Sequence, residues 1–139
     1  ERELAPTCSM PGVGIRGVIN LYGPSDLATT YANTGSIGFI RPAMELYLGG
    51  GPEAQGERYR LLSPLTYTAS AVPTLVIIGA RDRIIPPEQA DALGALLTAA
   101  GVFNEVIKIP ATDHAFDANW NGLATQIART KIHSFLQAN

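Results

Sequence analysis

Three stretches of the chain have the hydrophobic pattern of buried strands. They are LVII at 75–78, NEVIKIP at 104–110 and IRGVINLY at 15–22. The first is an uninterrupted apolar run, rich in β-branched side chains and bounded by Pro73 and Gly79. Such a run predicts a strand that is covered on both faces, as strands of parallel sheets are.

Two later stretches repeat their apolar positions with the period of a helix. Residues 87–100 and 118–137 each predict one helix. In the first, the buried stripe is expected to be Leu93, Leu96 and Leu97. The order strand, connection, strand, helix, strand, helix is that of an α/β fold, so we expect a parallel sheet with flanking helices and right-handed connections.

Residues 27–72 form a long connection between the first two predicted strands. Two helical stretches are predicted within it, at 39–48 and 53–62, and the glycines and proline at 49–52 separate them. The connection is too long for a plain crossover. Two interpretations stay open: a cap-like insertion of helices over a site, or an ordinary packed crossover.

The composition indicates a globular protein with a hydrophobic core. The 139 residues are 46% hydrophobic and 16% charged, with a formal net charge of −2, so residues 1–139 are expected to form a single domain. This charge does not indicate binding to nucleic acid or to an anionic membrane. No apolar run approaches the roughly 20 residues that span a bilayer. No secretory leader pattern is present, and the single Cys8 cannot form an intrachain disulfide. We expect a soluble protein, with the cytoplasm slightly favoured.

Two chemically useful residues follow the second and third predicted strands. Asp82 lies three residues after Gly79, and His114 lies four residues after Pro110. Because the carboxyl ends of parallel strands meet on one rim of a sheet, we expect the carboxylate and the imidazole to approach hydrogen-bonding distance. The plainer interpretation is that Asp82 caps a turn and His114 is a surface loop residue.

Three segments resemble the C-terminal half of an α/β-hydrolase. They are GVINLYGPSDL, SPLTYTASAVPTLVIIGARDRIIPPEQADALGALLTAAG and IPATDHAF. The resemblance covers residues 15–137 and points to the esterase, lipase and carboxylesterase branch, with a hormone-sensitive-lipase-like or feruloyl-esterase-like layout. Its specific parts are a G-x-x-D-x-x-x-P loop after one strand and a D-H-x-F loop after the next.

The resemblance implies a serine hydrolase that acts on carboxylic esters of small molecules. In it, Asp82 is the acid and His114 the base of a Ser-Asp-His triad, in which the histidine moves a serine proton and the carboxylate stabilises the imidazolium. The resemblance also implies a substrate pocket bordered by Tyr22, Asp26 and Phe116. From the residues alone, Asp26 closes a turn and Phe116 anchors the histidine loop by packing. No cofactor is called for, and no metal, because the two carboxylates next to the histidine are a weak set of ligands.

The chain departs from the family's pattern in its nucleophile. The family places a serine in a G-x-S-x-G elbow, and an HGG-type loop supplies oxyanion donors, but neither motif is present. No serine has the two glycines in frame: Ser9, Ser25, Ser36, Ser63, Ser70 and Ser134. We therefore expect the C-terminal part of an α/β-hydrolase domain whose N-terminal half, with the nucleophile, is absent, and which is inactive alone. Its expected partner is that missing half, or a second copy paired through the strand at 15–22.

Two other functions stay open on the sequence. One is a prolyl-oligopeptidase-like serine peptidase, whose C-terminal half has similar acid and histidine loops. The other is a non-catalytic, hydrolase-like binding module, which the missing serine favours. A β-propeller upstream would indicate the peptidase, and an HGG loop the esterase.

Overall fold

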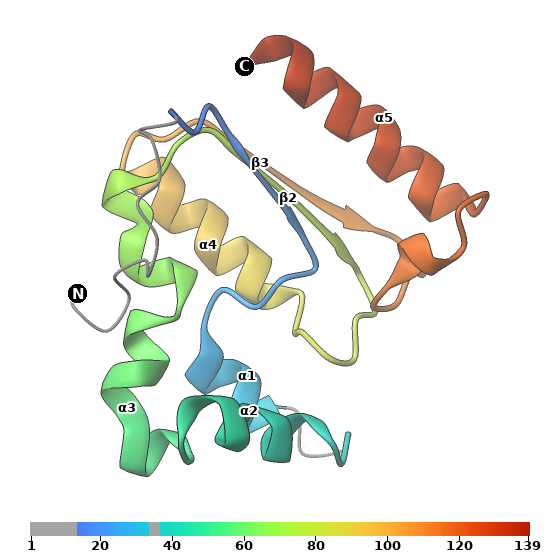
Figure 1. Cartoon of the computed structure of the whole chain (residues 1–139). Coiled ribbons are helices and arrows are strands. Elements are labelled where there is room, and N and C mark those ends of the chain that lie inside the picture. The colour runs from blue at the N-terminus through green and yellow to red at the C-terminus, as the bar shows by residue number, and fades with distance from the viewer. Residues whose placement is uncertain (1–13, 34–36) are drawn as a thin grey trace.

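A small parallel sheet is the centre of the fold. The structure, a computed structural model, describes residues 14–33 and 37–139. Its strands are β1 (Val18–Leu21), β2 (Thr74–Gly79) and β3 (Asn104–Ile109), side by side in the order β1-β2-β3 (Figure 1). Both pairings are parallel, and Val76 of β2 lies opposite Asn20 on one side and Val106 on the other. The predicted parallel sheet is confirmed.

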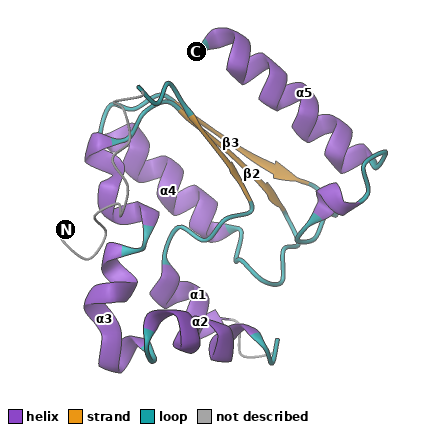
Figure 2. Cartoon of the chain, in the orientation of Figure 1, coloured by secondary structure: helices purple, strands orange, loops and turns teal. Residues whose placement is uncertain are grey.

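Helices cover both faces of this sheet. The helical segments of the described residues are α1 (Leu27–Asn33), α2 (Ile40–Leu48), α3 (Pro52–Leu61), the 3-10 helix Pro64–Ser70, α4 (Glu88–Ala99), the 3-10 turn Phe116–Ala118 and α5 (Leu123–Ala138). Figure 2 shows α4 and α5 on opposite sides of the strands. The chain is therefore an α/β fold of three layers, and none of the helices in its described part has the length and apolar character needed to cross a membrane.

The core is built around β2. Its side chains alternate between the two faces. Val76 and Ile78 join a buried cluster on the α4 side, and Leu75 and Ile77 join another on the α5 side. All four are at most 2% exposed, which explains why the run at 75–78 has no polar position.

Close packing of α4 on the sheet depends on a glycine. A Cβ at Gly94 would lie 2.6 Å from Cγ2 of Val106, closer than real contacts come. The prediction that Leu96 belongs to the buried stripe is wrong, because this side chain is 44% exposed. The stripe instead follows Gly94 with Leu93 and Leu97, and Leu96 is turned about 100° away from Leu97 on the helix.

Other element boundaries differ from the sequence prediction. The strand expected at 15–22 has ladder geometry only over Val18–Leu21, and Ile15 is 69% exposed. The last helix begins at Leu123 rather than at 118. Helix α1 was not predicted at all: the Asp26 carboxylate starts it by accepting the backbone N–H groups of residues 28 and 29 at 3.0 and 3.2 Å.

The connection at 27–72 has two kinds of contact. Helices α1, α2 and α3 pack on one another, and the 3-10 helix Pro64–Ser70 packs on α4. In Figure 1, α1 and α2 lie beyond the ends toward which the strands point. Within this connection, Ile37 lines the same cavity as His114. Part of the connection is thus an ordinary packed crossover, and part lies next to the candidate site.

Candidate active site

Asp82 is held in a tight loop after β2. Its amide N–H donates to the carbonyl of Gly79 at 3.1 Å, and its Oδ1 accepts the amide N–H groups of Ile84 and Ile85, each at 2.8 Å. The side chain is fully buried. One carboxylate oxygen therefore fixes the loop, and the other, Oδ2, is left for a different partner.

The loop after β3 touches the loop that carries Asp82. The amide of Arg81 donates to the carbonyl of Thr112 at 2.9 Å. A Cβ at Gly79 would lie 2.3 Å from the same Thr112 oxygen, so only glycine lets the two loops meet at this point.

Asp113 forms a clamp between the loop after β2 and the loop after β3. Its Oδ1 accepts the amide N–H groups of His114 at 2.8 Å and of Arg83 at 3.1 Å, and its Oδ2 accepts Nε of Arg83 at 2.6 Å. The hydrogen bond from the His114 amide, followed by those from Arg83, holds the pKa of the Asp113 carboxyl below its ordinary value. The clamp therefore depends on the ionised form of this carboxyl.

The two loops bring the carboxylate and the imidazole together, at the same end of neighbouring parallel strands. Nδ1 of His114 lies 2.8 Å from Oδ2 of Asp82. A carboxylate at Nδ1 favours the tautomer that carries its proton there, which leaves Nε2 as a proton acceptor. In the described part of the chain no hydroxyl donates to the His114 ring, whose side chain is 23% exposed. The geometry suits a general base aimed outward.

Of the other three residues expected at the site, Tyr22 lies beside the imidazole and Phe116 lies against Tyr22. The ring of Tyr22 is 4.5 Å from the His114 ring, centroid to centroid, and 5.5 Å from that of Phe116. Phe116 also packs against the buried cluster on the α5 side. Asp26 is placed elsewhere, at the start of α1, where it makes the capping bonds described above.

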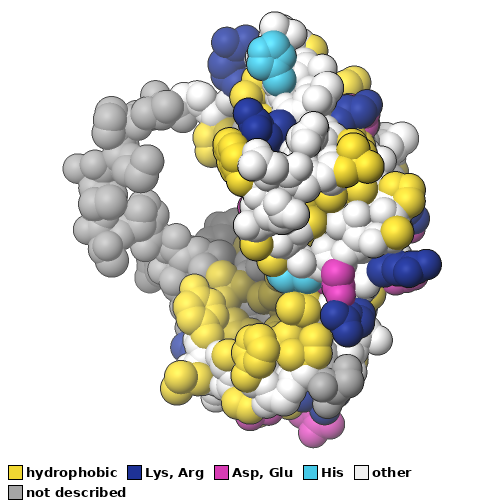
Figure 3. Space-filling view, turned by 90° about the vertical axis from the view of Figure 1, so that its right-hand side faces the viewer, with side chains coloured by type: hydrophobic (Ala, Val, Ile, Leu, Met, Phe, Trp, Pro, Cys, Tyr) yellow, Lys and Arg dark blue, Asp and Glu magenta, His cyan; other side chains and the backbone are white. Residues whose placement is uncertain are grey.

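A cavity of about 550 Å³ opens next to His114. It is lined by Ile37, Arg83, Ile84, Asp113, His114 and Ala115. Neither Ile37 nor Arg83 was predicted at the site: Ile37 lies in a segment without a motif, and Arg83 is an unspecified position of the G-x-x-D-x-x-x-P loop. Figure 3 views this side of the molecule, and hydrophobic side chains gather in its lower half. On α2 and at the residue before it, Phe39, Leu46 and Tyr47 are 68%, 88% and 80% exposed.

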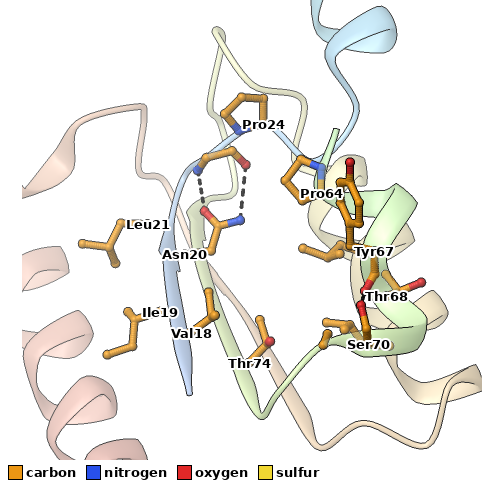
Figure 4. A pocket seen from close by; sticks show the side chains of 14 residues that line it. Val18, Ile19, Asn20, Leu21, Pro24, Pro64, Tyr67, Thr68, Ser70 and Thr74 are labelled. Carbon is orange, nitrogen blue, oxygen red and sulfur yellow. Dashed lines mark hydrogen bonds between the residues drawn. The ribbon is translucent and has the colours of Figure 1, made fainter. Parts of the chain in front are cut away.

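A second hollow of similar size lies away from the imidazole. This groove, about 560 Å³, runs along β1 between the 3-10 helix at 64–70 and α4 (Figure 4). Its wall includes Val18, Tyr67 and Leu97, and neither Asp82 nor His114 lines it. The groove is mostly apolar and carries no titratable pair, so the more polar cavity beside His114 is the candidate site.

Each described serine donates its hydroxyl to a backbone carbonyl and not to the His114 ring. Ser25 and Ser63 are buried and donate to the carbonyls of Gln89 and Tyr59. Ser70 and Ser134 donate to carbonyls within their own helices. Cys8, Ser9 and Ser36 lie outside the described residues. Among the described residues, no group of three or more His, Cys, Asp or Glu side chains is arranged to hold a metal ion.

A carboxylate and an imidazole on the carboxyl rim of a parallel α/β sheet define the class: the chain has the fold of an α/β-hydrolase. Residues 2–97 match the BD-FAE family, and the chain belongs to that family. No curated protein matches the sequence.

Solved structures of hydrolases share this fold. An acylaminoacyl peptidase from Pyrococcus horikoshii superposes with a TM-score of 0.71 at 23% identity, over 88% of this chain and 19% of that one. Carboxyl esterase 2 from Tuber melanosporum gives 0.70 at 21% identity, over 88% and 44%. A truncated carbohydrate esterase from gut microbiota gives 0.67 at 23% identity, over 88% and 42%. The chain thus spans about a fifth of the peptidase and less than half of either esterase.

Proposed function

We propose that this chain supplies the acid and the base of a serine hydrolase that acts on carboxylic esters. Asp82 is the acid and His114 the base, and the serine comes from a segment outside the described residues. The observation that carries the proposal is the 2.8 Å contact between the buried carboxylate and Nδ1 of His114. Membership of the BD-FAE family supports the ester as substrate class.

The proposed chemistry follows from the two nitrogens of the imidazole. Nε2 takes the proton of the serine hydroxyl as its oxygen attacks the ester carbonyl, and later returns it to the leaving alcohol. Asp82 keeps the Nδ1 proton in place and stabilises the imidazolium that forms in between. Because Asp82 is buried and also accepts the N–H groups of Ile84 and Ile85, it presents Oδ2 to the ring in one orientation.

The first experiment tests the base. The chain is expressed with the upstream part of its hydrolase, and hydrolysis of p-nitrophenyl esters is compared for the parent, His114→Ala and His133→Ala. His133 is the matched control because it is the other histidine and lies on the exposed face of α5. We expect His114→Ala to lose nearly all turnover and His133→Ala to keep it. Full activity in His114→Ala would refute the proposal.

The second experiment tests where the nucleophile comes from. We expect the 139-residue chain alone to hydrolyse these esters no faster than its own His114→Ala variant, because a base without a nucleophile forms no acyl-enzyme. Turnover by the chain alone that a serine-directed phosphonate abolishes would show that the nucleophile is within it.

A serine peptidase is the second candidate, and the structural similarity to the acylaminoacyl peptidase favours it. The same acid and base would then serve an amide instead of an ester. Comparing kcat/KM for p-nitrophenyl esters with that for acyl-amino-acid p-nitroanilides separates the two: a strong preference for the anilides supports the peptidase. If the assembled protein hydrolyses neither, a non-catalytic binding module is the function that remains.

We further propose that the missing half of the hydrolase covers β1 and its groove. In the described part of the chain β1 pairs only with β2, and Val18 at the groove is 43% exposed. An apolar edge of this kind pairs readily with another strand. In the absence of the other half we expect self-association, visible by sedimentation over a range of concentrations. A monodisperse 14.7 kDa species that unfolds cooperatively would contradict this.

A further inference from the structure

Tyr22 has an unusual backbone at the point where β1 ends. Its amide still donates to the carbonyl of Ile77 at 2.7 Å, so the residue is attached to the sheet. Its φ is 44°, in the left-handed region that aromatic residues rarely adopt. The turn that follows is stabilised by Asn20, whose Oδ1 accepts the amide of Gly23 at 2.7 Å (Figure 4). This backbone turns the Tyr22 side chain across the carboxyl rim of the sheet, toward the histidine loop.

The hydroxyl of Tyr22 is hydrogen-bonded to Asp117, three residues after His114 in the same loop. It donates to Oδ1 of Asp117 at 2.7 Å and thereby joins positions 95 residues apart. Asp117 lies in the 3-10 turn at 116–118, directly after Ala115, whose φ of 52° is also left-handed. The hydrogen bond to Asp117 is the main cause that raises the pKa of Tyr22 to about 12, so the hydroxyl keeps its proton under ordinary conditions.

The ring of Tyr22 lies against the imidazole itself. The two rings meet edge to face, with 4.5 Å between centroids and 60° between planes. Phe116 supports the tyrosine ring from another side at 5.5 Å. His114 is therefore held at Nδ1 by Asp82 and on its ring by Tyr22, while Nε2 is left for the reaction.

We infer that Tyr22, anchored by Asp117, is a positioning residue that holds the His114 imidazole in its working orientation. This inference rests on the proposed function and adds a second support to the acid. The hydroxyl has its effect through the tyrosine ring. Without the hydrogen bond to Asp117 that ring can rotate, and the imidazole then loses the contact that fixes its orientation.

The charges around the imidazole are compatible with this role. Asp113 is paired with Arg83 and Asp117 accepts the Tyr22 hydroxyl. Among the described residues, Asp82 is the carboxylate that bonds the ring. Tyr22 and Asp117 therefore act on the position of the imidazole rather than on its direct hydrogen bond.

The kinetic test uses the complete hydrolase that contains this chain. Tyr22→Phe removes the hydroxyl and keeps the ring, and we expect kcat to fall about 10- to 100-fold with little change in KM. Asp117→Ala removes the anchor without altering β1 and should do the same, whereas Asp117→Asn keeps an acceptor oxygen and should restore most of kcat. Tyr59→Phe is the matched control, because that hydroxyl also donates a hydrogen bond, to the carbonyl of Gly50 at 3.3 Å. It should leave kcat unchanged.

A spectroscopic test separates positioning from general stability. The proton on Nδ1 of His114, bonded to Asp82, should give a resolved downfield NMR signal in the parent and in Tyr59→Phe. We expect Tyr22→Phe and Asp117→Ala to broaden or lose it through faster exchange, at an unfolding midpoint close to that of Tyr59→Phe. An intact signal together with unchanged kcat in both variants would overturn the inference.

The two failures are distinguishable. If His114→Ala keeps full activity, the proposed function is wrong whatever Tyr22 does. If His114→Ala is inactive while Tyr22→Phe and Asp117→Ala keep the parent's kcat and Nδ1 signal, only the positioning role is wrong.

Discussion

Strands β2 and β1 are neighbours in one sheet, yet they differ in what surrounds them. β2 is paired on both sides, covered on both faces and buried over its whole length, and the loop after it holds Asp82. β1 has one described neighbour, and its residue Val18 is 43% exposed. The comparison teaches that the loops after β2 and β3 suffice to bring Asp82 and His114 together within this chain. The edge at β1, by contrast, has no second strand among the described residues, and its cover by another half of the hydrolase is a proposal.

The largest expected effect is on kcat, and it comes from changing Asp82 in the loop after β2. In the complete hydrolase, Asp82→Asn should lower kcat by about 10⁴-fold, because the asparagine no longer holds the reactive tautomer of His114. The fold should survive, since an amide oxygen can still accept the N–H groups of Ile84 and Ile85. Steady-state kinetics and the circular dichroism spectrum check both statements. A loss of less than tenfold would remove Asp82 from the triad.

The next effect contrasts an isoleucine in the core with one before the edge strand. Ile77 is 0% exposed and Ile15 is 69% exposed. We expect Ile77→Ala to lower the free energy of unfolding by about 2–5 kcal/mol because it leaves a cavity, and Ile15→Ala to change it by about 0.5 kcal/mol or less. Urea unfolding of both variants at one protein concentration measures the difference. Equal losses would show that the region before β1 is as buried as β2.

A charge on the edge should weaken association. Val18→Lys introduces the residue type that natural edge strands use against unwanted pairing, and we expect the apparent association constant of the isolated chain to fall by about tenfold, or ~1.4 kcal/mol. Leu136→Lys is the control, since Leu136 is 63% exposed on α5. Sedimentation velocity compares the two. If Leu136→Lys has the larger effect, the contact is on α5 rather than on β1.

The smallest effect concerns the clamp between the two site loops. The pKa of Asp113 is lowered in the folded chain from its ordinary 3.8, so its contribution to stability is fully present above pH 3.8. That contribution disappears as the pH falls through the lowered value. Asp113→Asn should therefore be less stable than the parent at neutral pH, and the difference should shrink in acid. Thermal unfolding between pH 7 and pH 2.5 follows it, and a gap that widens in acid would contradict the assignment.

Much of the fold followed from local pattern. The run at 75–78 predicted a central strand because a strand buried on both faces admits no polar side chain. The pairing of Asp82 with His114 was expected because each follows a predicted parallel strand by a few residues, and the structure places their side chains 2.8 Å apart. Their catalytic roles stay a proposal.

Other features depended on contacts that no local pattern signals. Leu96 was expected in the core, but the closeness of α4 to β3 at Gly94 sets which stripe faces the sheet. Helix α1 was missed because it is one short helix started by a single carboxylate. Tyr22 and Asp117 are 95 residues apart and belong to different loops, so their hydrogen bond could not be read from spacing.

The sequence by itself determined the class of fold, the strand order along the chain and the expectation that Asp82 and His114 meet. These follow from hydrophobic periodicity and from the rule that parallel strands end on one rim. Only the tertiary structure decided which side chains support that pair: the clamp at Asp113, the ring of Tyr22 and the glycine contact between the loops. The physical reason is that periodicity reports which face of an element is buried, whereas a support is a contact between distant loops whose geometry exists only after the sheet has formed.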